Sequence, residues 1–176
     1  MKLNQTAAPV MVIIEGVDRT GKDTLQQSLN KATDYKNMVM IRGPIGFLAY
    51  NKLYNKAVDA NEYLTIERQL KQVNHLVVYL TADTDELLQR FIDTNEEPLR
   101  EEKANANVSR RQTIEMHKKI HEIYYEYSTL NKMTIDTTNL TTEEVAEQVV
   151  KRINELYGRL TVTSAAGLSL SSIMTK

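Results

Sequence analysis

The sequence contains no cysteine, few glycines and prolines, and almost no excess of charge of either sign. Without cysteine it can form neither a disulfide framework nor a thiolate zinc site, which is compatible with a reducing cytoplasm. The formal net charge of -1 gives no basic surface of the kind that nucleic-acid-binding proteins show. We therefore expect no nucleic-acid partner.

Long hydrophobic runs are also absent. The run from Pro9 to Ile14 is too short for a membrane span or for the core of a signal peptide, and it ends at Glu15 and Gly16. We expect a soluble, cytoplasmic protein with no membrane partner. A length of 176 residues suits one hydrophobic core, and hence one main domain.

Short apolar runs alternate with helical patterns along the chain. The segment Val10 to Ile14 predicts a strand buried on both faces, and Lys22 to Lys31 predicts the helix that follows. Further strands are predicted at 37–41, 75–80 and 133–135, and further helices at two segments within 47–71, at 83–93, at 109–130 and from 141 onward. This alternation predicts an α/β fold in which a parallel sheet of about four strands is flanked by helices.

Capping boxes mark three of the predicted helix starts. They pair Asp83 with Glu86, Ser109 with Gln112, and Thr141 with Glu144.

The long helix after Ser109 has two candidate faces. Ile120, Ile123 and Tyr127 predict its apolar stripe. His117 and His121, one turn apart, are interpreted as part of a polar face, since no third metal ligand accompanies them.

The loop from Gly16 to Thr24 carries the strongest functional signal. It reads Gly16-Val17-Asp18-Arg19-Thr20-Gly21-Lys22-Asp23-Thr24, after a predicted buried strand and before a helix. In a phosphate-binding loop, glycines let backbone N–H groups surround the phosphates, while the lysine spans the β- and γ-phosphates. We therefore predict an ATP site made by these residues, with Lys22 as its central group.

Asp23 stands where such loops have Ser or Thr, whose hydroxyl binds Mg²⁺. A carboxylate there suits the helix dipole but repels a triphosphate unless a cation lies between them. We predict that Asp23 binds Mg²⁺ directly or through water and that Thr24 contacts a phosphate. The alternative is that Asp23 only caps the helix.

The string Glu15 to Lys22 resembles the phosphate-binding loop of thymidylate kinases that carry an arginine inside it. The resemblance implies a P-loop NTPase fold with three layers. It also implies that Arg19 neutralises charge on the transferring phosphoryl group and that Asp18 contacts the acceptor sugar. A second segment, Arg42 to Tyr50, is similar to the family's phosphate-gripping arginine segment, and so implies acceptor binding and a catalytic role for Arg42.

The sequence departs from that family in two places. Ile41 replaces the aspartate that usually precedes the arginine, and relatives have a further strand and a base-holding helix before Arg42. Such compaction is similar to that of thymidylate-kinase-like proteins of bacteriophages, which would place the protein in a host cytoplasm.

The domain boundaries follow from the same comparison. Residues 1–157 form the expected kinase domain, in which 95–111 resemble a lid, and 158–176 form a Ser/Thr-rich tail. Arg110 and Arg111 begin a predicted helix, where cations are disfavoured, so they are candidates to meet an anion when the lid closes. The alternative is that both side chains are simply solvated, as exposed arginines commonly are.

These observations predict a kinase that uses Mg²⁺ and ATP and transfers a phosphoryl group to a small phosphate-bearing acceptor, most simply a nucleoside monophosphate. A homodimer is a possible assembly. Two alternatives stay open: a kinase for a nucleoside or another small acceptor, and a nucleotide-binding module without turnover.

Overall fold

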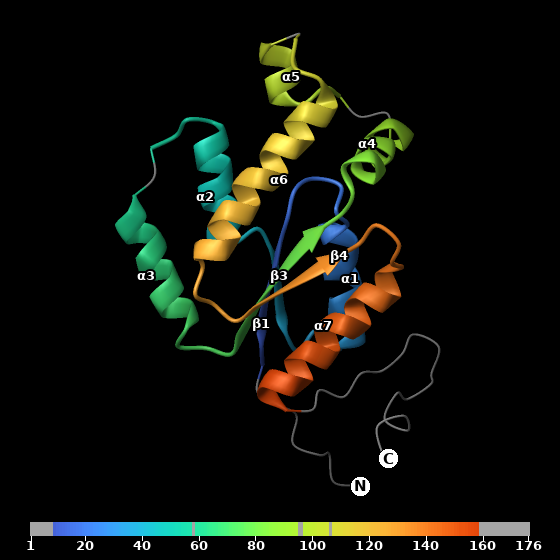
Figure 1. Ribbon diagram of the computed structural model, residues 1–176. Helices are drawn as coiled ribbons and strands as arrows, with labels where there is room; N and C mark the ends of the chain where they lie inside the picture. The colour runs from blue at the N-terminus through green and yellow to red at the C-terminus, as the bar shows by residue number, and fades with distance from the viewer. Residues whose placement is uncertain (1–8, 58, 95–96, 106, 159–176) are drawn as a thin grey trace, which may run out of the picture.

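The computed structural model describes residues 9–57, 59–94, 97–105 and 107–158. Four strands and seven helices follow one another in these residues (Figure 1). The strands are β1 (Met11–Glu15), β2 (Met38–Ile41), β3 (His75–Thr81) and β4 (Lys132–Asp136). The helices are α1 (Lys22–Ala32), α2 (Pro44–Leu53), α3 (Ala60–Leu70), α4 (Thr84–Asp93), α5 (Arg100–Ala104), α6 (Arg110–Tyr127) and α7 (Thr142–Tyr157).

The strands form one parallel sheet in the order β2-β1-β3-β4. The chain leaves β1 toward β2 on one side and later returns to place β3 on the other side of β1. In open parallel sheets, ligands bind at the carboxyl ends of the strands where the order reverses in this way. The topology therefore predicts a ligand site at the loop that follows β1.

Helices cover both faces of the sheet, so the fold has three layers (Figure 1). The helices α1 and α7 pack on one face, where Leu25, Leu29 and Val149 meet the strand residues Val12 and Val78. The other face carries α2, α3 and α6. Its core contains Ile13, Ile45, Val77, Tyr79, Tyr125 and Leu130.

The predicted fold class is confirmed, and every predicted strand is present with ends shifted by one residue or so. The capping boxes at Ser109 and Thr141 are both formed. The box predicted at Asp83 is wrong, because its side chain makes no cap hydrogen bond. Glu86, the intended partner, instead accepts a 2.8 Å hydrogen bond from Arg90.

The predicted faces of α6 are also wrong. Tyr127 is 78% exposed and Ile123 is 44% exposed, whereas His117 and His121 are buried. The buried stripe of α6 runs through Thr113, Ile114, His117, His121 and Tyr125. It is partly polar because it faces α2 and the ends of the strands, where the polar groups of the site gather.

The lid-like segment contains the short helix α5, and α6 begins at its end. Residues 95, 96 and 106 of this segment, and residues 159–176 of the predicted tail, lie outside the described residues.

None of the helices in the described part of the chain is long and hydrophobic enough to span a bilayer.

Candidate active site

The loop after β1 has an uncommon backbone conformation. Gly16 and Gly21 have φ of 133° and 88°, which favour glycine. Arg19, between them, has φ of 69°, which few residues with a side chain adopt. Gly21 is also the N-cap of α1, so the free N–H groups of the first helical turn adjoin the loop. Loop and helix together form the kind of site that binds phosphate.

Lys22, the first residue of α1, is folded back into this loop. Its Nζ donates a 2.5 Å hydrogen bond to the Val17 carbonyl and lies 3.8 Å from the Asp18 carboxylate. Burial lowers the pKa of Lys22 to about 8, although the charge of Asp18 acts in the opposite direction. A phosphate in the loop would favour the charged form of this amine.

Asp18 joins the loop to α2. One oxygen of its carboxylate, Oδ1, accepts hydrogen bonds from the Arg42 guanidinium at 2.9 Å and from the Tyr50 hydroxyl at 3.2 Å. Burial alone would raise the pKa of Asp18, but the charges of Lys22 and Arg42 and the hydrogen bond from Tyr50 lower it. The carboxylate is therefore ionised at neutral pH.

Arg42 lies just after β2 in the same left-handed region as Arg19, with φ of 62°. Its guanidinium is 4.5 Å from the centre of the Tyr50 ring and its side chain is 49% exposed. A non-glycine residue in this conformation is strained, so neighbouring contacts must hold it there. Such residues are found most often at functional sites. Arg42 thus presents a fixed cation beside Asp18 and Lys22.

Two buried histidines of α6 pack against the ring of Tyr50. The rings of His117 and His121 meet the Tyr50 ring edge-on, with centroids 6.1 and 5.2 Å away. Nδ1 of His121 lies 2.9 Å from the His117 carbonyl, which only accepts, so Nδ1 carries the proton. Burial lowers the pKa of His121 to about 4, so its ring is neutral at physiological pH.

Glu15, at the end of β1, holds the start of α2. Its carboxylate is fully buried and accepts hydrogen bonds from the backbone N–H groups of Gly43 at 2.9 Å and Gly46 at 3.0 Å. Burial raises the pKa of Glu15, and these two N–H groups act against that rise. Since Arg42 immediately precedes this helix start, Glu15 also fixes the position of Arg42.

A cavity of about 1040 Å³ opens over the loop. Most of the predicted site residues line it: Asp18, Arg19, Thr20, Gly21, Lys22, Asp23, Thr24 and Arg42. Gly16, the first residue of the loop, is buried. The sequence did not point to Glu15, Tyr50, Arg90 or Thr137 as site residues, since their contacts depend on elements far apart in the chain.

The residues at the start of α1 suit a magnesium ion. Asp23 and Thr24 line the cavity and offer a carboxylate and a hydroxyl, the hard oxygen ligands that Mg²⁺ prefers. Within the described residues, no group of three or more His, Asp or Glu side chains is placed to hold a metal ion. A nucleotide-bound Mg²⁺ needs fewer protein ligands, because phosphates and water complete its shell.

The two predicted lid arginines do not line this cavity. Arg110 makes a bidentate ion pair with the Glu102 carboxylate, in which two guanidinium nitrogens lie 3.0 and 3.1 Å from the two carboxylate oxygens. The Arg110 guanidinium also lies over the Phe91 ring. Arg111 pairs with Asp85 and Glu115. Their role as anion-binding groups on lid closure stays a prediction.

Solved structures similar to this one share its fold. The YorR protein from Bacillus subtilis, in complex with phosphorylated GDP, is 18% identical with a TM-score of 0.66 over 82% of this chain and 95% of that one. Polyphosphate kinase 2 from Arthrobacter aurescens is 14% identical with a TM-score of 0.55, over 86% and 70%. A thymidylate kinase from Candida albicans is 15% identical over 86% and 93%, but its TM-score of 0.45 is too low to support an argument.

No curated protein sequence matches the chain. The thymidylate kinase assignment is therefore not confirmed, whereas a P-loop kinase fold is.

A sequence model of the shikimate kinase family matches residues 59–154. The match begins at α3 and ends within α7, so it contains β3, β4 and the lid-like segment but not the phosphate-binding loop. The family match and the phosphate-binding loop are thus independent features of the chain, since the loop lies outside the matched residues. Kinases of this type use ATP with Mg²⁺ and act on a small acceptor. Because the match covers more than half of the sequence, the chain belongs to the shikimate kinase family and is a small-molecule kinase.

Proposed function

We propose that the protein transfers the γ-phosphoryl group of ATP to the phosphate of a nucleoside monophosphate. The observation that carries this proposal is the cluster of Asp18, Arg42 and Tyr50 beside Lys22. In this cluster a fixed guanidinium lies beside the loop, and arginine is the side chain best suited to grip a phosphate.

The donor is held by the loop and α1. Lys22 and the loop N–H groups bind the β- and γ-phosphates, and Asp23 and Thr24, which line the cavity, would hold the Mg²⁺ that accompanies ATP. When bound, Mg²⁺ would offset the repulsion between the phosphates and the Asp23 carboxylate. The side chain of Arg19 neutralises charge that develops on the transferring group.

The acceptor is held by two residues next to Lys22. Arg42 binds its phosphate, and Asp18 orients its sugar. Phosphoryl transfer of this kind depends on positioning and on positive charge, with little covalent chemistry for the protein to perform. An ionised acceptor phosphate needs no general base.

The resemblance of the loop to thymidylate kinases makes thymidine monophosphate the first acceptor to test. The family match favours a second candidate, a small hydroxyl-bearing acceptor such as shikimate. In that case Arg42 would grip a carboxylate or phosphate on the acceptor instead of the reacting group.

The deciding experiment measures acceptor-dependent ADP release from Mg-ATP. The panel contains all common ribo- and deoxyribonucleoside monophosphates, nucleosides and shikimate, with Lys22→Ala as the inactive control. Turnover on monophosphates that is lost in the control supports the proposal. Turnover on shikimate or nucleosides alone contradicts it, and ATP binding without turnover on any acceptor indicates a non-catalytic module.

A further inference from the structure

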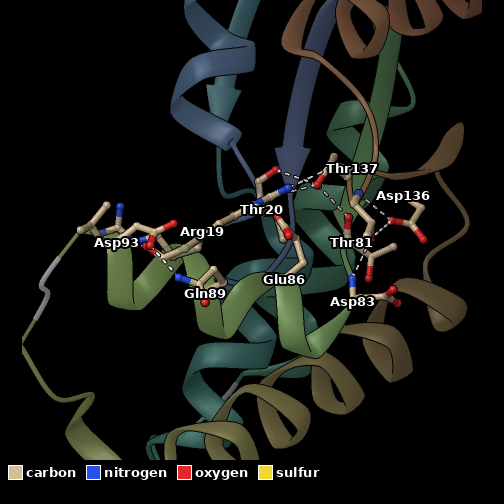
Figure 2. A network of polar contacts seen from close by, with 12 residues as sticks. Arg19, Thr20, Thr81, Asp83, Glu86, Gln89, Asp93, Asp136 and Thr137 are labelled. Carbon is tan, nitrogen blue, oxygen red and sulfur yellow. Dashed lines mark hydrogen bonds and ion pairs between the residues drawn. The ribbon is translucent and has the colours of Figure 1, made fainter.

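Helix α4 reaches the phosphate-binding loop with two consecutive side chains, Arg90 and Phe91. Neither belongs to the loop, and neither follows from its sequence pattern. Figure 2 shows this region, where Thr20 of the loop lies beside Thr137 and Arg19 extends along α4 toward Asp93.

Arg90 ties the loop to the segment after β4. Its guanidinium donates hydrogen bonds of 3.0 Å to the backbone carbonyl of Arg19 and of 3.0 Å to that of Thr137, and its Nε donates to Glu86 at 2.8 Å. The Thr137 hydroxyl is a further acceptor at 3.3 Å. A guanidinium presents five N–H donors in a fixed plane, so one side chain can hold all these groups in one geometry.

Thr137 extends the connection to the rest of the sheet. Its hydroxyl lies 3.0 Å from the Thr81 carbonyl and 3.4 Å from the Thr20 carbonyl. Its backbone N–H also donates to Thr81, at 2.8 Å. The carbonyls of two successive loop residues, Arg19 and Thr20, therefore face groups anchored to β3 and β4.

Phe91 contacts the other end of Arg19. The Arg19 guanidinium lies over the Phe91 ring, 5.6 Å from its centre, and the ring itself is 2% exposed. A cation over an aromatic face is attracted by the ring quadrupole. Arg90 thus holds the backbone of Arg19 while Phe91 supports its side chain.

We propose that Arg90 and Phe91 are positioning residues, which hold Arg19 in its left-handed conformation and aim its guanidinium at the transferring phosphoryl group. The inference rests on the proposed function, because it requires that Arg19 act on that group. If the contacts are removed, Arg19 can relax toward the negative φ that non-glycine residues prefer. A displacement of about 1 Å at a reacting centre can lower the rate by roughly 100-fold.

The experiment compares Arg90→Lys, Phe91→Leu and Arg19→Ala in the full chain, using the acceptor identified by the panel. Lysine keeps the positive charge of Arg90 but cannot bridge several acceptors at fixed angles. We expect kcat to fall by about 10- to 100-fold in all three variants, while KM for the acceptor changes by less than about 3-fold. A fourth variant, Arg90→Ala, removes the guanidinium altogether, and added guanidinium chloride should restore part of its rate.

Two control variants separate positioning from general damage. Arg152→Gln removes an arginine in an exposed ion pair with Glu155 on α7. Leu87→Val trims a fully buried residue in the same small core as Phe91. Leu87→Val should lower the melting temperature about as much as Phe91→Leu, yet both controls should keep kcat near that of the wild type.

The double variant of Arg19→Ala with Arg90→Lys provides the sharpest test. If Arg90 acts through Arg19, its kcat should lie within about 2-fold of that of Arg19→Ala alone. Losses that multiply instead would overturn the inference, since the two arginines would then act independently.

The outcomes also separate this inference from the proposed function. If Arg19→Ala keeps full kcat, both the assigned role of Arg19 and the inference are wrong. If Arg19→Ala loses activity while Arg90→Lys and Phe91→Leu keep it, the inference alone is wrong.

Discussion

Tyr50 donates its hydroxyl hydrogen to Asp18 at 3.2 Å, although 32 residues separate them in the sequence. The same carboxylate oxygen accepts a hydrogen bond from the guanidinium of Arg42, which also lies over the Tyr50 ring. One tyrosine therefore supports the Arg42–Asp18 pair both through its hydroxyl and through its ring. This arrangement lets the contribution of the hydroxyl be tested separately from that of the ring.

Replacing Tyr50 by Phe removes the hydroxyl and keeps the ring. A hydrogen bond of this kind contributes about 0.5–1.5 kcal/mol, so KM for the acceptor should rise by roughly 2- to 10-fold. KM for ATP should not change, since Tyr50 is not among the residues that line the cavity over the phosphate-binding loop. Initial rates at varied acceptor and saturating ATP measure the effect, with Tyr127→Phe as the matched control because Tyr127 is 78% exposed. A rise in KM for ATP instead would contradict the assignment of Tyr50 to the acceptor side.

The affinity for ATP should decrease as the pH rises above about 8. In the free protein the pKa of Lys22 is lowered by burial to about 8, so the ammonium deprotonates above that pH. Bound phosphate favours the ammonium and raises the pKa, so the dissociation constant should increase by up to about tenfold per pH unit. Equilibrium titrations with Mg-ATP from pH 7 to 10 measure this slope. Lys22→Arg, which keeps its charge, should show a much flatter profile, and equal slopes in the two proteins would refute the explanation.

The same lysine affects stability in the opposite direction. Between about pH 8 and its ordinary value of 10.5, the amine of Lys22 carries a proton in the unfolded chain that it lacks in the folded one. The contribution of Lys22 to the free energy of unfolding should therefore increase with pH in this window. Urea unfolding of the wild type and of Lys22→Gln checks the sign, because the glutamine variant should lack the increase.

Glu15→Gln should loosen the start of α2. A glutamine can accept from only one of the two N–H groups of Gly43 and Gly46, because its amide nitrogen is itself a donor. Leaving a buried donor unpaired costs about 1–3 kcal/mol of unfolding free energy. We also expect a higher KM for the acceptor, because Arg42 precedes this helix start. Gly46→Ala gives an independent check, since its added Cβ would lie 2.5 Å from the Glu15 carboxylate.

Tyr157→Phe should destabilise the fold without changing catalysis. The Tyr157 hydroxyl donates to the His75 carbonyl at 2.6 Å and accepts from the His75 N–H at 3.1 Å and from Asn131 at 2.8 Å. These groups lie at the amino ends of β3 and β4, opposite the site. We expect a loss of about 2 kcal/mol in urea unfolding and an unchanged kcat. A changed kcat would show that the far end of the sheet is coupled to the site.

The phosphate-binding loop could be predicted because its signal is local. A buried strand, two spaced glycines, a lysine and a helix start occupy one short stretch, and the loop geometry is largely determined within it. The donor half of the candidate site therefore required little tertiary information. The sequence predicted a parallel sheet but not the order of its strands, since strand pairing depends on contacts between distant segments.

The roles of Glu15 and Arg90 could not be predicted for the same reason. Glu15 ends a strand, and nothing near it in sequence indicates that it accepts from Gly43 and Gly46. Arg90 lies in an ordinary amphipathic helix. Its hydrogen-bond acceptors, the carbonyls of Thr137 and Arg19, are in loops 47 and 71 residues away in the sequence. Apolar spacing alone does not identify the buried face of α6, because that face includes two histidines, His117 and His121.

The hydrogen bond between Arg90 and Thr137 affects when, during synthesis, the phosphate-binding loop can reach its final conformation. On the ribosome, the loop after β1 emerges early, but Arg90 and β4 follow much later, and non-local contacts of this kind form only when both partners are present. Until β4 has left the exit tunnel and paired with β3, no contact of Thr137 can hold the loop. A growing chain therefore lacks the finished contacts of the phosphate-binding loop until Thr137 has left the tunnel.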